Sequence, residues 1–116
     1  YGTLRRGEPN HRLLRTARYV GPDATQPAFT LHSLGGYPGM VAGGTTAVVG
    51  EVYEVDGLTL AALDRLEGYP GYYDRVELSL ASGTTALCYV MAQRQVRGRP
   101  IIISGDWLEY NKEVVR

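Results

Sequence analysis

Residues 56–68, DGLTLAALDRLEG, carry the clearest helical pattern in the chain and so fix one helix with both of its ends. Asp56 is placed to cap the amino end, and Gly68 and Pro70 form a stop signal at the other end. Apolar side chains recur between them at helical spacing on one stripe, which consists of Leu58, Leu60, Ala62, Leu63 and Leu66. The other strong patterns in the sequence belong to strands.

Two segments predict strands by alternating apolar and polar residues. Residues 46–55, TAVVGEVYEV, predict one long strand in which Gly50 allows another backbone to approach closely. Residues 75–91, RVELSLASGTTALCYVM, predict a hairpin of two strands joined at Ser82 and Gly83.

The remaining segments predict shorter elements. Residues 11–21 predict a short helix that runs into a strand at residues 17–20 and stops at Gly21 and Pro22. Residues 29–46 predict a strand at residues 29–31 only, followed by glycine-rich loops, and a short amphipathic helix is expected from about Asp106. Because strands outnumber helices, the predicted fold is α+β, a small mixed β-barrel or sheet with a few flanking helices.

Length and composition limit the number of domains and the kinds of molecule that the protein could bind. The 116 residues fit one domain, 1–116, with one modest core. Twelve acidic and twelve basic side chains balance, which argues against a nucleic-acid partner, and no apolar run approaches the roughly 20 residues that span a bilayer. Cys88, the only cysteine, lies in an apolar run and is expected to be a small buried residue of a reducing compartment, so we expect a cytoplasmic protein.

The sequence lacks the residue patterns typical of metal binding, phosphate binding and covalent catalysis. His11 and His32 stand apart from each other and from any cysteine or carboxylate at ligand spacing, so no metal is expected. The glycine-rich stretch has no strand-to-helix setting for a phosphate, and no serine or cysteine lies in a nucleophile-elbow pattern. No cofactor is expected.

Glu67 is the carboxylate whose position suggests chemistry. On a helical projection it falls at about 180° from Leu58, between Leu60 and Leu63, and therefore borders the apolar stripe. It also lies in the last helical turn, where the helix dipole disfavours negative charge, and partial burial acts in the same direction. Both effects would raise its pKa toward the range of a general base at neutral pH. From position alone, a glutamate at a frayed helix end is the more ordinary interpretation. Asp64 and Arg65 fall on the opposite, solvated face of the helix.

Two neighbouring features fit a small-molecule pocket. Tyr69, Tyr72 and Tyr73 follow Glu67 in a Pro-Gly loop, where their rings could wall a pocket, although core filling would also explain them. Residues 1–4, YGTL, look like a strand end entering a turn, and we expect a short apolar strand ahead of them. Such a turn can offer consecutive backbone N–H groups to an anionic group, because Gly2 has no side chain to block the approach.

Together these residues resemble the gamma-glutamylcyclotransferase-like superfamily, and especially its gamma-glutamylamine cyclotransferase branch. The resemblance runs through four stretches in the same order, which are YGTLRRGEPNH (1–11), VVGEVYEVD (48–56), LDRLEGYPGYYDR (63–75) and SGDW (104–107). It implies a strand-rich barrel whose cavity binds a gamma-glutamyl group. The family's first strand precedes the position of Tyr1.

The resemblance also implies roles for single residues. Glu67 is expected to be the catalytic acid and base, and the backbone of Tyr1, Gly2, Thr3 and Leu4 is expected to hold the substrate. Tyr73 should border the pocket, and Arg75 is expected to be structural. The implied reaction is attack of the substrate's α-amine on its own γ-carbonyl, which forms 5-oxoproline and releases an amine or amino acid.

Two other functions remain open from the sequence. One is a binding module that keeps the pocket without catalysis, since fold alone does not establish activity. The other is a hydrolase that removes a gamma-glutamyl group with water. The expected partner is a small gamma-glutamyl amine or peptide, and the sequence does not indicate an oligomeric state.

Overall fold

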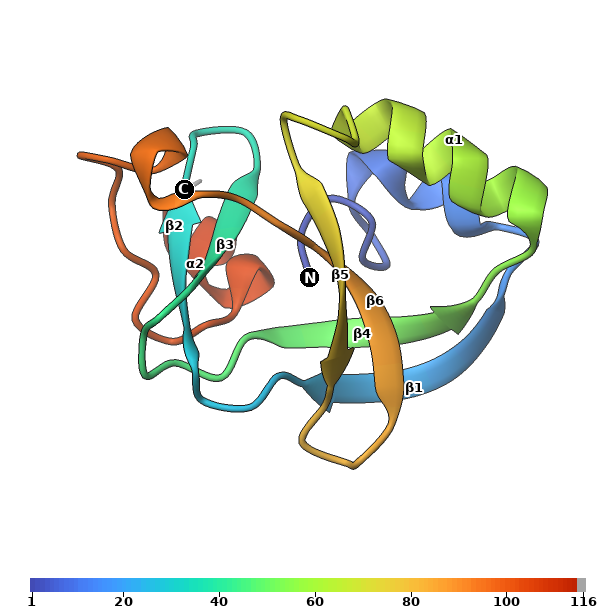
Figure 1. Cartoon of the computed structure of the whole chain (residues 1–116), viewed down its shortest axis with the longest axis horizontal. Coiled ribbons are helices and arrows are strands. Elements are labelled where there is room, and N and C mark those ends of the chain that lie inside the picture. Colours follow the sequence, from blue (N-terminus) through green and yellow to red (C-terminus); the bar gives the residue numbers. More distant parts are fainter. Residues whose placement is uncertain (115–116) are drawn as a thin grey trace.

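The computed structural model describes residues 1–114 and contains two α-helices, two 3-10 helices and six strands in that range (Figure 1). The helical elements are η1 (Pro9–Leu14), α1 (Gly57–Glu67), η2 (Gln93–Gln95) and α2 (Trp107–Val114). The strands are β1 (Arg18–Ala24), β2 (Phe29–Ser33), β3 (Pro38–Ala42), β4 (Val49–Glu54), β5 (Asp74–Ser79) and β6 (Thr85–Val90).

The strands pair as three antiparallel two-stranded sheets, β1 with β4, β2 with β3 and β5 with β6. Isolated bridges join Thr25 to Leu80, Phe29 to Thr46 and His32 to Ile101. Figure 1 shows the β5–β6 hairpin crossing the β1–β4 pair, with β2 and β3 to one side and α1 with η1 to the other. The α+β prediction is confirmed, but the strands of the described chain form antiparallel pairs rather than a closed barrel.

The prediction of a short helix that runs into a strand at residues 11–21 is confirmed in outline, but its bounds differ in two respects. The helical turn is the 3-10 helix η1, which begins earlier, at Pro9, where the fixed φ of proline suits a first helical position. Strand β1 continues through Gly21 and Pro22 to Ala24. Its pairing with β4 shifts register between Tyr19 and Gly21, so an irregularity accommodates the two residues that the prediction treated as a stop.

The prediction of loops over most of residues 29–46 was also wrong. Strands β2 and β3 form a hairpin there, from Phe29 paired with Ala42 to Ser33 paired with Pro38. Strand β3 is buried along most of its length, which hides the alternation by which strands are recognised. Gly39 leaves room for its neighbours there, because an added Cβ would lie 2.7 Å from the Met91 sulfur and would require that side chain to shift.

Helix α1 has the predicted ends. Asp56 accepts a hydrogen bond from the Thr59 N–H at 2.7 Å, and Gly68 ends the helix with a left-handed φ of 67°. The predicted apolar stripe included residues that do not face the protein interior, since Leu58 is 85% exposed and Leu66 is 40% exposed. Leu63 is the buried residue of the helix, so the inward face is centred next to Glu67.

The core lies between β2, β3 and α2. Its most deeply buried side chains are Trp107, Leu31, Met40, Ile102 and Val48, and a second buried cluster consists of Val41, Tyr73, Met91 and Val96. Helix α2 begins where the sequence predicted, with the Asp106 carboxylate accepting from the N–H groups of Leu108 and Glu109. The Trp107 indole donates to Glu8 at 2.9 Å, which fastens the segment before η1 to the core. Among the helices of residues 1–114, none combines the length and the apolar character needed to cross a membrane.

Candidate functional site

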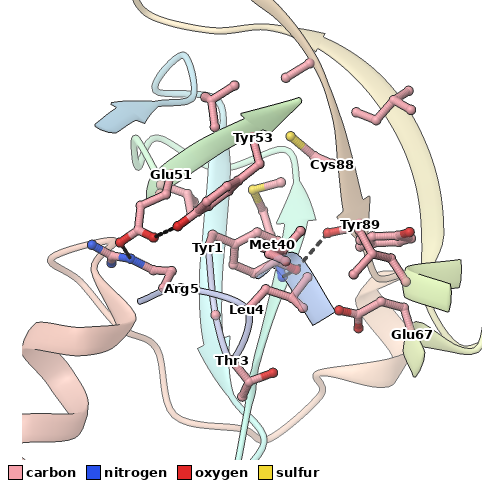
Figure 2. A pocket seen from close by; sticks show the side chains of 18 of the residues that line it. Tyr1, Thr3, Leu4, Arg5, Met40, Glu51, Tyr53, Glu67, Cys88 and Tyr89 are labelled. Carbon is pink, nitrogen blue, oxygen red and sulfur yellow. Dashed lines mark hydrogen bonds and ion pairs between the residues drawn. The ribbon is translucent and has the colours of Figure 1, made fainter. Parts of the chain in front are cut away.

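A cavity of about 860 Å³ lies between the β1–β4 pair, the β5–β6 hairpin, helix α1 and residues 1–4 (Figure 2). We refer to residues 1–4 as the YGTL turn. The residues to which the family resemblance assigned catalysis or substrate binding all lie along this cavity, namely Tyr1, Gly2, Thr3, Leu4, Glu67 and Tyr73. Segments that are distant in the sequence therefore meet around one space.

The Tyr1 side chain anchors the YGTL turn inside the protein. Its hydroxyl donates to the Tyr89 carbonyl at 2.7 Å and accepts from the Met40 N–H at 3.1 Å. Burial raises the pKa of this hydroxyl well above its ordinary value, so it stays protonated. As predicted, Gly50 allows a close approach, because its Cβ would lie 3.4 Å from Tyr1 Cα.

The YGTL turn presents free backbone donors. Its carbonyls accept hydrogen bonds, with Arg5 N–H donating to Gly2, Asn10 N–H to Thr3 and His11 Nδ1 to Leu4. By contrast, the N–H groups of Gly2, Thr3 and Leu4 make no hydrogen bond to residues 1–114. Gly2 is pressed against Pro38, whose Cδ would lie 2.7 Å from an added Cβ. Three consecutive donors are thus available beside the cavity.

Glu67 brings an unpaired carboxylate to the same cavity. It is the last residue of α1 and is half-buried, and its side chain forms no ion pair or hydrogen bond within the described chain. Burial raises its pKa from the ordinary 4.5 to about 7. Figure 2 shows the carboxylate pointing toward the YGTL turn, with Tyr89 nearby. A carboxyl group with this pKa can both accept and return a proton near neutral pH.

Tyr73 closes one side of the site. It is 5% exposed, and its hydroxyl donates to the Pro38 carbonyl at 2.5 Å. Burial, followed by the neighbouring Tyr1 hydroxyl and Glu67 carboxyl groups, raises the pKa of this hydroxyl far above its ordinary value. The phenol is therefore held neutral, with its proton engaged by the backbone.

The three tyrosines after Glu67 do not act together as a wall. Tyr73 and Tyr72 line the cavity, and the Tyr72 hydroxyl is hydrogen-bonded to that of Tyr37. Tyr69 lies outside the cavity lining and packs its ring on the Arg75 guanidinium at 4.7 Å. The sequence placed the loop correctly but could not say which rings turn inward.

Asp64 was wrongly placed on the solvated face of α1. It is half-buried, and its carboxylate accepts from Arg75 at 2.5 Å and from the Tyr89 hydroxyl at 2.6 Å. The hydrogen bond from Tyr89, together with Arg75, holds the pKa of Asp64 below its ordinary value. Arg75 thus has the structural role expected of it, because it ties the β5–β6 hairpin to the helix that carries Glu67.

Two further cavity residues had no clear sequence signal. The sequence predicted Cys88 to be a small buried residue, and the structure places it half-buried and along the cavity. Burial raises the pKa of its thiol, which disfavours the thiolate. Glu51 on β4 accepts hydrogen bonds from residues 5, 6 and 53, and only the period-2 alternation of the strand could have indicated that it faces inward.

Metal ligands do not gather in residues 1–114, where no three His, Cys, Asp or Glu side chains lie close enough to hold an ion. His11 and His32 each contact a backbone carbonyl through Nδ1, at 2.9 Å from Leu4 O and 3.2 Å from Arg99 O.

Comparison with known proteins decides the family. A family model described as "Gamma-glutamyl cyclotransferase, AIG2-like" matches residues 1–109. The chain belongs to this family. The Escherichia coli K12 protein YtfP, named as a gamma-glutamylcyclotransferase family protein, is 43% identical over 112 residues, which cover 97% of this chain and 96% of YtfP.

Solved structures of similar proteins share the fold of this gamma-glutamylcyclotransferase family member. The solution structure of Escherichia coli ytfP matches with a TM-score of 0.69 and 40% identity, over 89% of this chain and 88% of that one. The crystal structure of an uncharacterized protein from Pyrococcus horikoshii matches with a TM-score of 0.80 and 33% identity, over 98% of this chain and 91% of that one. The resemblance predicted from the sequence is confirmed, and the YGTL turn, Glu67 and Tyr73 all lie within the matched residues.

Proposed function

We propose that this chain is a gamma-glutamyl cyclotransferase, which converts a gamma-glutamyl amine or peptide into 5-oxoproline and a free amine or amino acid. The observation that carries the proposal is the half-buried, unpaired Glu67 carboxylate, which points toward the YGTL turn, whose N–H groups of residues 2–4 have no partner in the described chain. One group can move a proton and the other can bind negative charge, so the two supply what an intramolecular acyl transfer needs.

The reaction forms a bond between the α-nitrogen and the γ-carbon and breaks the bond between that carbon and the departing nitrogen. Glu67, in its ionised form, takes a proton from the substrate's α-ammonium and leaves a nucleophilic amine. As the ring closes, the α-nitrogen loses its second proton to water, and Glu67 gives its proton to the departing nitrogen. The carboxylate is thereby regenerated, and the released amine takes up the remaining proton from water.

A pKa of about 7 suits both halves of this transfer. An ordinary glutamate would be a poor base toward an ammonium group of pKa about 8, and burial brings Glu67 within about one pKa unit of it. A carboxyl group with this pKa is also partly protonated at neutral pH, so Glu67 can donate a proton to the departing nitrogen.

The YGTL turn has the complementary role of binding. Its consecutive N–H groups can hold the substrate's α-carboxylate or polarise the γ-carbonyl, and Gly2 lets an anionic group approach. Because the nucleophile and the electrophile belong to one molecule, a folded substrate conformer in the cavity supplies a large part of the rate enhancement. Tyr73, with its hydroxyl held by Pro38, serves as a rigid wall against which that conformer packs.

The proposed partner is therefore a small gamma-glutamyl compound. We further propose that the protein works in the cytoplasm, because a single, half-buried cysteine in an apolar run is typical of a protein in a reducing compartment.

The test is to incubate the protein with a panel of gamma-glutamyl amines and dipeptides and to measure 5-oxoproline and glutamate by mass spectrometry. Enzyme-dependent 5-oxoproline supports the proposal, and the panel ranks the leaving groups. Glutamate in place of 5-oxoproline would indicate hydrolysis by water. Ligand binding without either product would indicate a binding module.

A further inference from the structure

We propose that Glu51 is a positioning residue, which holds the YGTL turn in the geometry that its free N–H groups need to bind substrate. The inference rests on the proposed function, which supplies the substrate. The placement of the turn by Glu51 can nevertheless be tested without measuring turnover.

Glu51 collects three donors, two of which belong to the residues that directly follow the turn. Its carboxylate accepts from the Arg6 N–H at 3.0 Å, from Arg5 Nε at 3.4 Å and from the Tyr53 hydroxyl at 2.9 Å. The side chains of Glu51 and Arg5 are only 10% and 11% exposed. The carboxylate thus links β4 to the end of the turn at both a backbone and a side-chain position, as Figure 2 shows for Arg5 and Tyr53.

Arg5 extends this link to a second element. Its Nη1 donates to Asp106 at 2.8 Å, and the same Asp106 oxygen accepts from the N–H groups at the start of α2. One guanidinium therefore joins β4 to α2 across the end of the turn. The Arg5 N–H also donates to the Gly2 carbonyl at 3.1 Å, so fixing Arg5 fixes the carbonyl side of the turn.

The other side of the turn is held by the hydrogen bonds of the Tyr1 hydroxyl and by packing. Gly2 lies against the Pro38 ring, and Tyr1 lies against Gly50 of β4. The Tyr1 contacts hold the start of the turn, and the Glu51 contacts hold its end and so fix its orientation. With both in place, the N–H groups of residues 2–4 are oriented before substrate arrives, as a binding site of backbone donors requires.

An ionised carboxylate is the group that this position needs. It accepts from all three donors at once, whereas an amide would turn a donor toward the guanidinium or the backbone N–H. Burial of Glu51 acts against the charge, but the hydrogen bonds from Arg6, Tyr53 and Arg5 outweigh it and hold its pKa below the ordinary value. The contact is therefore constant through neutral pH.

The first test compares Glu51→Ala with Glu54→Ala by steady-state kinetics. Glu54 lies three residues further along β4, in an exposed ion pair with Arg18, and is the matched control. If the turn binds substrate equally in the ground and transition states, its displacement raises KM by at least about tenfold and leaves kcat within about threefold. Glu51→Gln, which keeps one acceptor oxygen, should show a smaller rise in KM, and Glu54→Ala should show none.

A merely structural role gives a different result. Partial unfolding lowers the active fraction and hence the apparent kcat, but the molecules that remain folded keep their KM. An unchanged KM in Glu51→Ala would therefore overturn the proposal.

The second test measures backbone NMR order parameters of residues 2–6 in the wild type, Glu51→Ala and Glu54→Ala. The expected result is a rigid turn in the wild type and the control, with S² near 0.85, and S² below about 0.6 in Glu51→Ala. A rise in KM with a turn that stays rigid would mean that Glu51 itself contacts the substrate, which contradicts the proposal. If the wild type forms no 5-oxoproline, the proposed function fails, whereas the order parameters still decide whether Glu51 holds the turn.

Discussion

Glu67→Gln should make the protein more stable above neutral pH. In the unfolded chain Glu67 ionises near its ordinary pKa of 4.5, whereas burial raises its pKa in the folded protein to about 7. A raised pKa means that the folded state holds its proton more tightly than the unfolded state does. Stability from this group is therefore fully present below pH 4.5 and is lost as the pH rises through 7. A neutral glutamine at the same position suffers no such loss.

The size of the effect follows from the two pKa values. A difference between 4.5 and about 7, at about 1.4 kcal/mol for each pKa unit, corresponds to about 3 kcal/mol. Because Glu67 is half-buried and faces a cavity, solvent screening reduces the measured effect to about 2–3 kcal/mol. This is a large share of the roughly 5–15 kcal/mol by which a domain is stable.

Urea denaturation of the wild type and Glu67→Gln at about pH 4.5 and pH 8 measures this difference. Carboxylates whose pKa values are lowered, such as Asp64 and Glu51, have the opposite pH dependence, but they are common to both proteins and cancel in the comparison. The two proteins should be similar in stability at the lower pH, and Glu67→Gln should gain about 2–3 kcal/mol relative to the wild type at the higher one. An equal difference at both pH values would refute a raised pKa, and with it the argument for Glu67 as a base at neutral pH.

Three other substitutions test the surroundings of the site. Tyr73→Phe removes the hydroxyl that donates to Pro38 and leaves a buried carbonyl without its partner, so urea denaturation should show a loss of about 1–3 kcal/mol. Gly2→Ala places a Cβ 2.7 Å from the rigid Pro38 ring and must shift the YGTL turn, so kcat/KM for 5-oxoproline formation should fall at least about tenfold while the circular dichroism spectrum is retained. Gly68→Ala forces an L-residue to a φ of 67°, and thermal or urea denaturation should show a loss of about 1–2 kcal/mol; an unchanged stability would mean that α1 ends differently from the geometry described.

Elements with local signals were predictable from the sequence. Helix α1 has its cap at Asp56 and its stop at Gly68, both encoded in neighbouring residues, and the hairpin at residues 74–90 has its turn between two alternating runs. Strand β3 was missed because a strand buried on both faces has no alternation. Strand β1 was cut short because Gly21 and Pro22 usually stop a strand, and only pairing with β4 shows that an irregularity absorbs them.

In the candidate site, too, features set by neighbouring residues could be predicted, whereas features set by contacts between distant residues could not. The position of Glu67 beside the apolar face depends on helical geometry within one turn, and it could be reached from the sequence. The contacts of Glu51 with Arg5, and of Arg5 with Asp106, join residues that are 46 and 101 positions apart in the chain. Asp64 was placed on a solvated face for the same reason, because Arg75 and Tyr89 reach it from a hairpin that the helical projection does not include.

The central claim is that Glu67 transfers the proton in gamma-glutamyl cyclisation, and the direct measurement is the rate of 5-oxoproline formation at saturating substrate by Glu67→Gln. The matched control is Glu77→Gln, which makes the same change at an exposed position on β5. We expect Glu67→Gln to lose about 10²–10⁴-fold in kcat while it binds the gamma-glutamyl substrate within about threefold of the wild type, and we expect the control to keep full activity. Glu67→Gln that forms 5-oxoproline within about tenfold of the wild-type rate would contradict the account.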